Sequence, residues 1–426
     1  MNVKVFKFGG ASVNTAAGVR NVAGILEKHR GQSVMVVASA MGKTTNALEN
    51  LLRDYIARDP VAMVEKFYLL KDFHTDILHE LFENKEHPVF EAVGRLFEEL
   101  RGRLQSPPEK GYDETYDQVV PYGELFSCLI LHHYLEQCEL PVKLFDARQL
   151  VLTDSTFRDA RVDWAKTQLR IQKHLFTWFQ DAKGRMGLTH GFIGSDPQGR
   201  MTTLGREGSD FTAAILAYAL RTKEVTIWKD VPGVLNADPK WFGNPVKLDS
   251  LSYLEAIELA YYGASVIHPK TIKPLENANI RLKVKSFLDP NAEGTTIENL
   301  REWKVPCPIY IRKTNQVLIS VSPRDFSFIM EENLSQLFNI LSKHHVKANV
   351  MQNSAVTFSV CADHDPVHID PLLKELKHLF SVRFNDGLEL YTIRHYDQEA
   401  IDRIAGQKKV LLEQKTRSTV HLVLSP

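Results

Sequence analysis

Hydrophobic and polar positions follow a repeating order along the first 300 residues. Short apolar runs at residues 3–8 and 33–39 predict strands that are buried on both faces of a sheet. A glycine turn at 9–13 and a polar turn at 40–46 each lead into a segment with helical periodicity. This order of strand, turn and helix predicts an α/β fold with a mainly parallel sheet. Ligands then bind beyond the carboxyl ends of the strands, where these turns lie.

A helical insertion is predicted over about residues 53–110, where helix breakers are few. Apolar residues recur there at steps of three and four, which predicts a stripe facing the core. The stripe consists of Phe67, Leu70, Phe73, Ile77 and Leu81, then Val89, Val93, Leu96 and Leu100. Histidines at 74, 79 and 87 have no metal-ligand partners nearby in the sequence, so we expect them to be solvated or packed.

The stretch 187–220 carries the densest set of chemically active residues. An apolar strand ends in residues 191–194, a polar hairpin follows at 196–199, and a glycine loop at 202–210 leads into an apolar helix predicted over 211–220. Ser209 and Asp210 are interpreted as the capping pair of this helix, whose free amides favour an anion. Arg206 adds a guanidinium to the same loop, so the expected ligand is a carboxylate or a phosphate.

Beyond about residue 300 the pattern changes, and prolines at 306 and 308 mark the boundary. Predicted strands at 317–322, 347–352, 355–361 and 382–385, with helices at 334–344 and 370–379, give the βαββαβ order of a ferredoxin-like unit. Elements at 388–394, 398–404, 409–413 and 419–424 form an abbreviated second unit. The predicted domains are therefore 1–300, 309–379 and 380–426, and the catalytic residues belong to the first.

Composition excludes several classes of protein. Lys+Arg and Asp+Glu are 52 each, so no excess of charge points to nucleic acid or to an anionic membrane. The four cysteines are scattered, which argues against a disulfide framework and a zinc site, and no metal-binding side chains are predicted. Apolar runs are shorter than the roughly 20 residues of a membrane span. We expect a cytoplasmic protein with no nucleic-acid or membrane partner.

The ordered set of motifs resembles the aspartate kinases, from Val3 to about Ile297, and the C-terminal part resembles their paired ACT domains. The motifs are KFGG (7–10), SAMGKTTN (39–46), GELFS (123–127), DARVDW (159–164), GFIGSDPQGRMTTLGREGSD (191–210), WKDVPGVLNADP (228–239) and GASVIHPKT (263–271). The resemblance implies a carbamate-kinase-like sandwich, the amino-acid-kinase fold, followed by ferredoxin-like α+β ACT domains.

The activity that the resemblance implies is transfer of the γ-phosphate of ATP, with Mg²⁺, to the side-chain carboxylate of L-aspartate. The product is 4-phospho-L-aspartate, the first step toward lysine, threonine and methionine. A carboxylate nucleophile is ionised at pH 7, since its pKa is about 3.9, and needs no general base. The resemblance also implies a homodimer formed through the ACT domains.

The resemblance assigns roles to individual residues. Lys7 and Asp210 are the implied catalytic residues, and the implied aspartate site consists of Ser39, Thr45, Glu124, Arg206 and Ser209. In it, Arg206 holds the α-carboxylate at two points and Glu124 pairs with the α-ammonium. The implied ATP-binding residues are Lys7, Gly9, Gly10, Lys229, Asp230, Leu235, Lys240, Ser265 and Val266.

Three positions of the kinase part depart from the family pattern: Ala11, Glu207 and Ser265. A glutamate at 207 brings a negative charge close to phosphates, which weakens their binding unless it faces solvent or a cation. Ser265 replaces a common phosphate-contacting lysine, and a substitute cation is expected among three lysines, Lys43, Lys240 and Lys270.

The ACT part departs at Asn349 and Ala355, where lysine-sensitive relatives have acidic residues that hold the amines of the effector. We therefore expect that lysine does not inhibit this enzyme through that site. Two alternatives to aspartate kinase activity remain at this point. One is a related kinase acting on glutamate, acetylglutamate or a nucleotide, and the other is a ligand sensor with a decayed kinase domain.

Overall fold

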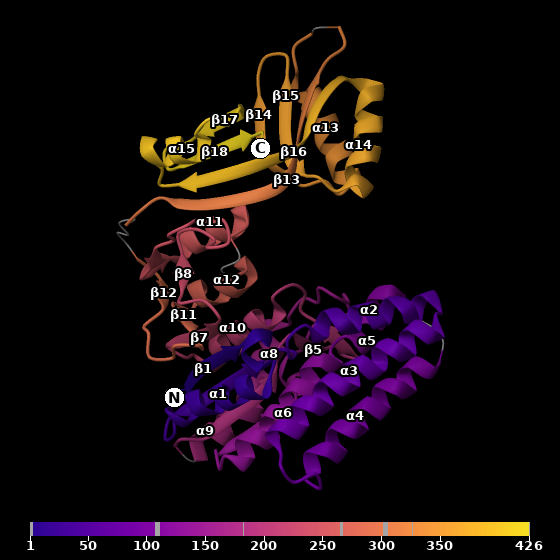
Figure 1. The fold of residues 1–426 in the computed structure, drawn as a ribbon, viewed down its shortest axis with the longest axis vertical. Helices are drawn as coiled ribbons and strands as arrows, with labels where there is room; N and C mark the ends of the chain where they lie inside the picture. The colour runs from indigo at the N-terminus through magenta and orange to yellow at the C-terminus, as the bar shows by residue number, and fades with distance from the viewer. Residues whose placement is uncertain are drawn as a thin grey trace. The chain divides into compact units, whose positions relative to one another are not determined.

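The computed structural model describes residues 3–106, 111–181, 183–264, 267–300, 306–325 and 327–425. The chain forms two compact units, coloured by residue number in Figure 1. The first unit consists of Met1–Val234, Lys247–Ile257 and Val266–Trp303, and the second of Leu235–Val246, Glu258–Ser265 and Lys304–Pro426. The three domain ranges predicted from the sequence stay predictions.

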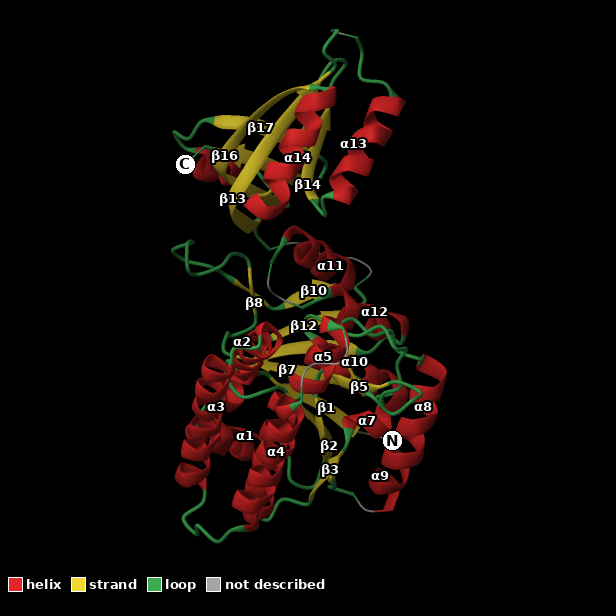
Figure 2. Cartoon of the chain, turned by 90° about the vertical axis from the view of Figure 1, so that its right-hand side faces the viewer, coloured by secondary structure: helices red, strands yellow, loops and turns green. Residues whose placement is uncertain are grey.

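The first unit is built on an eight-stranded sheet with the order β10-β12-β11-β7-β1-β2-β4-β3. All neighbouring strands in it run parallel except β11 and β12, so the predicted mainly parallel sheet is confirmed. Its strands are β1 (Val3–Phe8), β2 (Ser33–Ala38), β3 (Val142–Phe145), β4 (Met186–His190), β7 (Glu224–Lys229), β10 (Ser250–Ser252), β11 (Arg281–Ser286) and β12 (Thr295–Glu298). Short strands β8 (Val234–Leu235) and β9 (Lys247–Leu248) lie outside this sheet. Figure 2 shows strands of the sheet among the helices of this unit.

Helices account for most of the remaining first-unit residues. They are α1 (Ala16–Glu27), α2 (Thr44–Ala57), α3 (Pro60–Leu81), α4 (Pro88–Gln105), α5 (Tyr112–Val119), α6 (Tyr122–Gln137), α7 (Ala147–Leu150), α8 (Trp164–Ile171), α9 (Thr177–Asp181), α10 (Gly208–Leu220) and α12 (Pro269–Asn277), while α11 (Tyr253–Tyr262) includes residues of both units. The predicted insertion is helical, being formed by α3 and α4 with the end of α2. In the described part of the chain, no helix combines the length and the apolar character needed to cross a bilayer.

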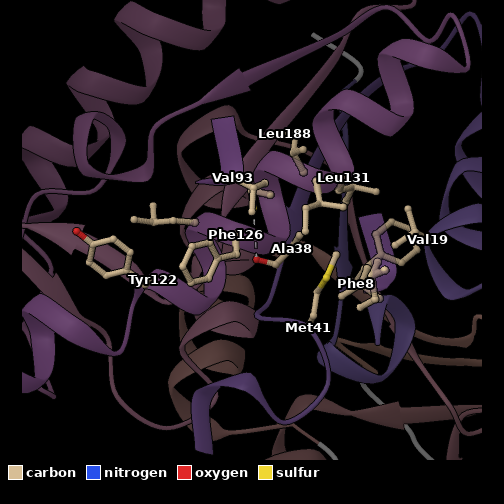
Figure 3. Close-up of a cluster of buried hydrophobic side chains, with 14 of the residues drawn as sticks. Phe8, Val19, Ala38, Met41, Val93, Tyr122, Phe126, Leu131 and Leu188 are labelled. Carbon is tan, nitrogen blue, oxygen red and sulfur yellow. Dashed lines mark hydrogen bonds between the residues drawn. The ribbon is translucent and has the colours of Figure 1, made fainter. Parts of the chain in front are cut away.

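Most of the predicted apolar stripe of the insertion belongs to a continuous core, but Phe73 is an exception, since 36% of it is exposed and it lines a hollow next to Lys43. Val93 from α4 and Phe126 from α6 lie in one cluster with Phe8 of β1 and Leu188 of β4 (Figure 3). His74 is buried there, where its Nδ1 lies 2.8 Å from the carbonyl oxygen of Leu70. Burial lowers the pKa of His74 to about 4, so this histidine is a neutral packed residue.

The start of α10 differs from the prediction. The helix begins at Gly208 rather than Phe211, and Glu207 occupies the N-cap position with φ 54° and no capping side-chain hydrogen bond. Ser209 and Asp210 therefore lie within the first turn, and their interpretation as a capping pair is wrong. The left-handed backbone at Glu207 reverses the chain abruptly, which lets the helix begin three residues early.

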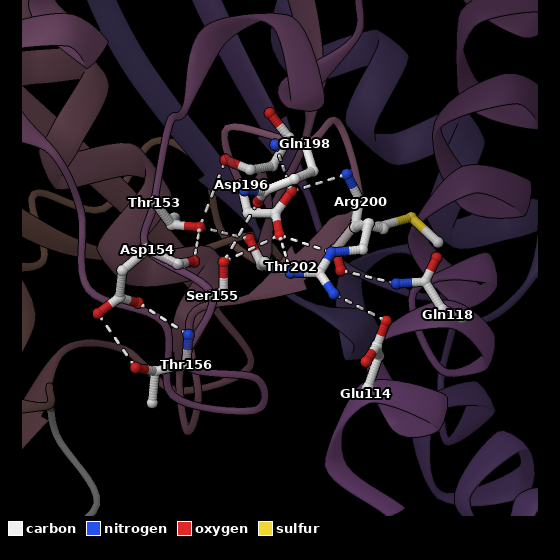
Figure 4. Close-up of polar contacts among 12 residues, drawn as sticks. Glu114, Gln118, Thr153, Asp154, Ser155, Thr156, Asp196, Gln198, Arg200 and Thr202 are labelled. Atoms are coloured by element: carbon white, nitrogen blue, oxygen red, sulfur yellow. Dashed lines mark hydrogen bonds and ion pairs between the residues drawn. The ribbon is translucent and has the colours of Figure 1, made fainter. Parts of the chain in front are cut away.

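A small hairpin precedes this loop, formed by β5 (Ile193–Ser195) and β6 (Met201–Thr203). Asp196 closes its turn, since its carboxylate accepts hydrogen bonds from the backbone of Gln198 and from the backbone and side chain of Arg200. The guanidinium of Arg200 also forms an ion pair with Glu114 of α5, with 3.1 Å between Arg200 Nη1 and Glu114 Oε1 (Figure 4). The hairpin is thus tied to α5, and it fixes where the glycine loop begins.

The second unit contains a six-stranded sheet with the order β14-β15-β13-β16-β18-β17. Its elements are β13 (Ile309–Ser322), α13 (Glu331–Lys343), β14 (Ala348–Asn353), β15 (Phe358–Asp363), α14 (Pro366–Leu379), β16 (Ser381–Arg394), α15 (Gln398–Ala405), β17 (Val410–Lys415) and β18 (Thr419–Leu424). The predicted strands 382–385 and 388–394 are one strand, β16, because the chain passes Gly387 with φ 63° without leaving the sheet. Strands β13 and β16 pair over their whole lengths with local irregularities, so the two ferredoxin-like units share them.

Candidate active site

A cavity of about 720 Å³ lies in the first unit at the carboxyl ends of the central strands. Lys7 comes from the end of β1, Ser39 follows β2, Phe192 follows β4, and Lys229 ends β7. This is the position that ligands take in open α/β sheets. The cavity is lined by Lys7, Gly10, Ser39, Ala40, Gly42, Thr45, Glu49, Tyr116, Glu124, Arg158, Asp159, Phe192, Gly205, Arg206, Glu207, Gly208, Ser209, Asp210 and Lys229.

Lys7 and Asp210 form an ion pair in this cavity. The Lys7 Nζ lies 2.6 Å from Asp210 Oδ1, and the two side chains are 11% and 4% exposed. Asp210 sits in the first turn of α10, where the amino end of the helix favours a negative charge. Desolvated charges interact strongly, so the pair fixes the ammonium group of Lys7 at the edge of the cavity.

Glu124 is a buried carboxyl group with spare bonding capacity. It lies in the first turn of α6, and its Oε1 accepts a hydrogen bond of 3.3 Å from the backbone of Ala40. Its Oε2 has no hydrogen-bond partner in the structure. Burial raises the pKa of Glu124 to about 8, against smaller opposing effects from hydrogen bonds and from Lys7. A cationic ligand group in the cavity would satisfy this carboxylate.

Arg206 contributes a positively charged guanidinium group to the cavity. It lies in the loop between β6 and α10, and it forms no ion pair with any described carboxylate. The neighbouring Gly205 has φ 78°, a conformation that suits glycine.

The loops of the cavity also approach closely at Gly10, where a Cβ atom would lie 2.8 Å from the carbonyl oxygen of Ala40. The turns after β1 and β2 therefore meet only because residue 10 is glycine.

Glu207 does not extend into solvent. Its Oε2 accepts a hydrogen bond of 2.9 Å from the backbone N–H of His268, the N-cap residue of α12. The partial positive charge at the start of α12 partly balances its negative charge. The sequence analysis expected the charge of Glu207 to weaken phosphate binding unless it faced solvent or a cation. In the structure this carboxylate has a specific partner, the backbone N–H of His268.

Asp117 of α5 is a supporting residue that the sequence analysis missed. It is fully buried, and its carboxylate accepts hydrogen bonds from the backbone N–H groups of Arg158 and Thr203 and from the hydroxyl of Thr203. It therefore joins two segments next to the cavity. Burial outweighs these bonds and raises its pKa to about 6. A buried aspartate in an amphipathic helix has no local signal, because its partners are remote in sequence.

Further lining residues also went unpredicted. Tyr116 donates a hydrogen bond of 2.7 Å to Glu49, and the guanidinium of Arg158 lies 4.8 Å from the centroid of the Tyr116 ring. Tyr116, Glu49 and Arg158 line the cavity, and none of them belongs to a motif given above. Asp159 also lines it and begins the DARVDW motif, but the sequence assigned it no role.

Several predicted nucleotide-binding residues do not line this cavity. Gly9 adjoins it, since a Cβ atom there would lie 3.4 Å from Lys7 Nζ. Asp230 is exposed, Leu235 and Lys240 belong to the second unit, and Ser265 and Val266 lie outside the described residues. Their roles stay predictions.

The expected substitutes for a lysine at 265 are not among the lining residues. Lys43 lines a different hollow, next to α3, and Lys270 forms an ion pair with Asp159. Lys229 is a cation that does line the cavity.

One described group of side chains elsewhere has ligand atoms close enough for a metal ion: His132, His133 and Glu136 on α6, all within 4.8 Å of one another. None of them lines the cavity.

Comparisons with known proteins identify the family to which the chain belongs. The chain is 29% identical over 399 residues to lysine-sensitive aspartokinase 3 of Escherichia coli K12, covering 92% of this chain and 86% of that protein. It is 33% identical over 299 residues to a bifunctional aspartokinase/homoserine dehydrogenase 1 of Zea mays, of which it spans only 32%. Its structure is similar to that of E. coli aspartokinase III in complex with aspartate and ADP, with a TM-score of 0.80, 27% identity, and coverage of 99% and 96% of the two chains. The amino acid kinase family model matches residues 2–286. This chain therefore belongs to the amino acid kinase family.

Proposed function

We propose that this protein is an aspartate kinase, which transfers the γ-phosphate of ATP to the side-chain carboxylate of L-aspartate and releases 4-phospho-L-aspartate and ADP. The observation that carries the proposal is that two complementary side chains in one cavity, a guanidinium and a carboxyl group, have unused bonding capacity. Arg206 has no described carboxylate partner, and buried Glu124 has a free oxygen. An α-amino acid supplies one carboxylate and one ammonium group, which match them.

In this proposal the substrate is held by its α-carbon groups, and its side chain is directed to the phosphate. Arg206 binds the α-carboxylate, Glu124 binds the α-ammonium, and the hydroxyl groups of Thr45, Ser39 and Ser209 complete the site. Arginine suits the first role because its planar fork bonds a carboxylate at two points.

Phosphoryl transfer to this substrate requires placement and charge compensation. The attacking carboxylate is already ionised, so no residue has to remove a proton. Lys7 carries the positive charge that balances the γ-phosphoryl oxygens, and Asp210 keeps its ammonium group in place. The backbone at Gly9 and Gly10 allows close approach of the phosphates, and Lys229 is the cation at the end of β7.

The residues present fit a Mg²⁺ ion carried by the nucleotide. Magnesium retains most of its water and phosphate ligands and takes only one or two carboxylates from a protein. Asp210, which lines the cavity beside Lys7, is the carboxylate that would contact the ion. When bound, the ion supplies further positive charge to the phosphate oxygens.

The assembly and location remain parts of the same proposal. We infer a homodimer formed through the second unit, as the resemblance to the family implies; the outer strands of the sheet in this unit are β14 and β17. A cytoplasmic location is supported by the four cysteines, all of which are free.

The test is aspartate-dependent formation of aspartyl hydroxamate from ATP and hydroxylamine. The acyl phosphate reacts with hydroxylamine, so hydroxamate appears only if a carboxyl group has been phosphorylated. A coupled ADP assay with aspartate, glutamate and acetylglutamate identifies the acceptor. Activity with glutamate alone would assign the protein to another kinase, and no activity with any acceptor would favour a ligand sensor.

A further inference from the structure

A second cavity of about 540 Å³, which we call the side cavity, lies within the first unit between α8, α10 and α12. Helices α10 and α12 pack against each other there. None of the roles proposed above uses this space. Its volume is within the range of roughly 300–1,000 Å³ typical of small-molecule sites.

One wall of the side cavity is aromatic. Trp164 meets Tyr218 edge to face, with ring centroids 5.2 Å apart, and meets Phe211 at 6.1 Å in the same manner. These contacts hold the indole ring in place, while 36% of Trp164 remains exposed. A fixed and partly exposed indole favours a flat apolar group.

The other lining groups are mainly cationic. The charged residues that line the side cavity are Asp159, Arg161, Lys270 and Lys273, so positive charges exceed negative ones. Lys270 pairs with Asp159, but Arg161 and Lys273 form no ion pair with any described carboxylate. Two unpaired cations beside an aromatic wall favour an organic anion.

Asp159 connects the side cavity to the candidate active site, because it lines both. Its ion pair with Lys270 is held weakly, since the two side chains are 66% and 38% exposed. An anion in the side cavity attracts Lys270 and leaves Asp159 without its partner. Asp159 and Arg206 both line the candidate active site, so a carboxylate freed from Lys270 would attract the guanidinium to which aspartate is proposed to bind.

We propose that the side cavity binds a small organic anion, an apolar ring that carries a carboxylate or a phosphate, and that this ligand weakens the binding of aspartate. The aromatic wall takes the ring, and Arg161 and Lys273 take the charge. The part of the proposal that concerns aspartate rests on the proposed function, whereas the binding site itself does not.

Binding is tested on the full-length protein with phenyl phosphate as the probe, by calorimetric titration with ADP present in excess to fill the nucleotide site. The double substitution R161Q/K273Q is expected to weaken binding about tenfold, because two charge contacts are lost. The control is Lys223→Gln, a cation after the end of α10 and outside the side cavity, which should leave binding unchanged. Benzoate, which also joins a ring to an anionic group, should bind too. Inorganic phosphate, which has no ring, and benzyl alcohol, which has no charge, should each bind more weakly than phenyl phosphate. Equal binding to the wild type and the double variant, or no binding of phenyl phosphate, would overturn the site.

The coupling is tested by steady-state kinetics. Phenyl phosphate is expected to raise the KM for aspartate about two- to fivefold with kcat unchanged, and to have no such effect on R161Q/K273Q. If phenyl phosphate binds but the KM for aspartate does not change, the coupling to the active site is refuted, while the binding site in the side cavity still stands. Should the protein phosphorylate no aspartate, the titration still decides whether the side cavity binds anions, so the two failures are distinguishable.

Discussion

The Oε2 atom of Glu207 accepts a hydrogen bond of 2.9 Å from the backbone N–H of His268, which joins the loop before α10 to the start of α12. Glu207 forms this bond from a left-handed backbone conformation that costs a non-glycine residue energy. The Glu207 side chain therefore holds the loop that carries Arg206, at a position where glycine would adopt the backbone conformation at lower energy. The bond offsets the conformational cost.

Replacing Glu207 separates these two effects. In E207Q the amide oxygen accepts the same hydrogen bond, so we expect an unchanged KM for aspartate. In E207G the bond is lost while backbone strain is relieved. We expect a KM for aspartate raised about fivefold, as for the loss of one hydrogen bond of about 1 kcal/mol, with a nearly unchanged melting temperature. Equal KM values for E207G and the wild type would contradict a positioning role.

Lys7 is predicted to be essential for turnover. Lys7→Ala should lower kcat at least about 100-fold, because the charge that balances the phosphoryl group is lost. It also leaves Asp210 buried without its partner, which lowers stability, and D210N in the same protein should restore part of it. The control is Lys4→Ala on the same strand, since Lys4 does not line the cavity. Wild-type turnover in a folded K7A protein would exclude the proposed role.

The pKa of Glu124, about 8, predicts a pH dependence of substrate binding. The ammonium of aspartate pairs with the ionised carboxylate, which is the minor form below pH 8. The KM for aspartate should therefore fall about tenfold per pH unit as the pH rises toward 8 and then level off. In E124Q the KM should be higher and lack this dependence. A flat profile in the wild type would contradict the assignment of Glu124 to the ammonium.

The same shift predicts a change in stability. The pKa of Glu124 is raised from 4.5 in the unfolded chain to about 8 in the folded one, so between these values the folded state binds more protons. The free energy of unfolding of the ligand-free wild type should decrease, relative to E124Q, as the pH rises through this window. Urea unfolding at a series of pH values measures the difference, and parallel curves would refute it.

Lysine is predicted not to inhibit through the second unit. Asn349 carries no charge, and its side chain is already occupied by Gln316, Asp363 and Lys313, with bonds of 2.8 to 3.0 Å. An internal ammonium group, that of Lys313, thus contacts Asn349. Initial rates with and without lysine should be equal, with E. coli lysine-sensitive aspartokinase 3 as the inhibited control. Inhibition together with lysine bound at Asn349 and Ala355 would contradict this prediction.

The fold class and the clustering of the motifs could be predicted because both depend on local patterns. Buried strands followed by polar turns define a parallel sheet, and the ends of such strands meet at one edge. Residues as distant as Lys7, Glu124 and Asp210 are thereby brought into one cavity.

What could not be predicted depends on partners far apart in the chain. Asp117 is a structural aspartate only because Arg158 and Thr203 approach it. The start of α10 depends on the backbone of Glu207, whose partner is 61 residues away. The sequence predicts two strands where the structure has the single strand β16, because Asn385, Asp386 and Gly387 have the composition of a turn.

The pairing of β13 with β16 has a mechanical consequence. Each is a 14-residue strand, and each half belongs to a different ferredoxin-like unit. Neither unit can therefore melt without removing ladder partners from the other, so the sheet should unfold as one cooperative block. Amide hydrogens at 309–313 and 317–322 should exchange with similar protection despite their different surroundings. A twist imposed at one end of these two paired strands would therefore be transmitted along their whole length to the other ferredoxin-like unit.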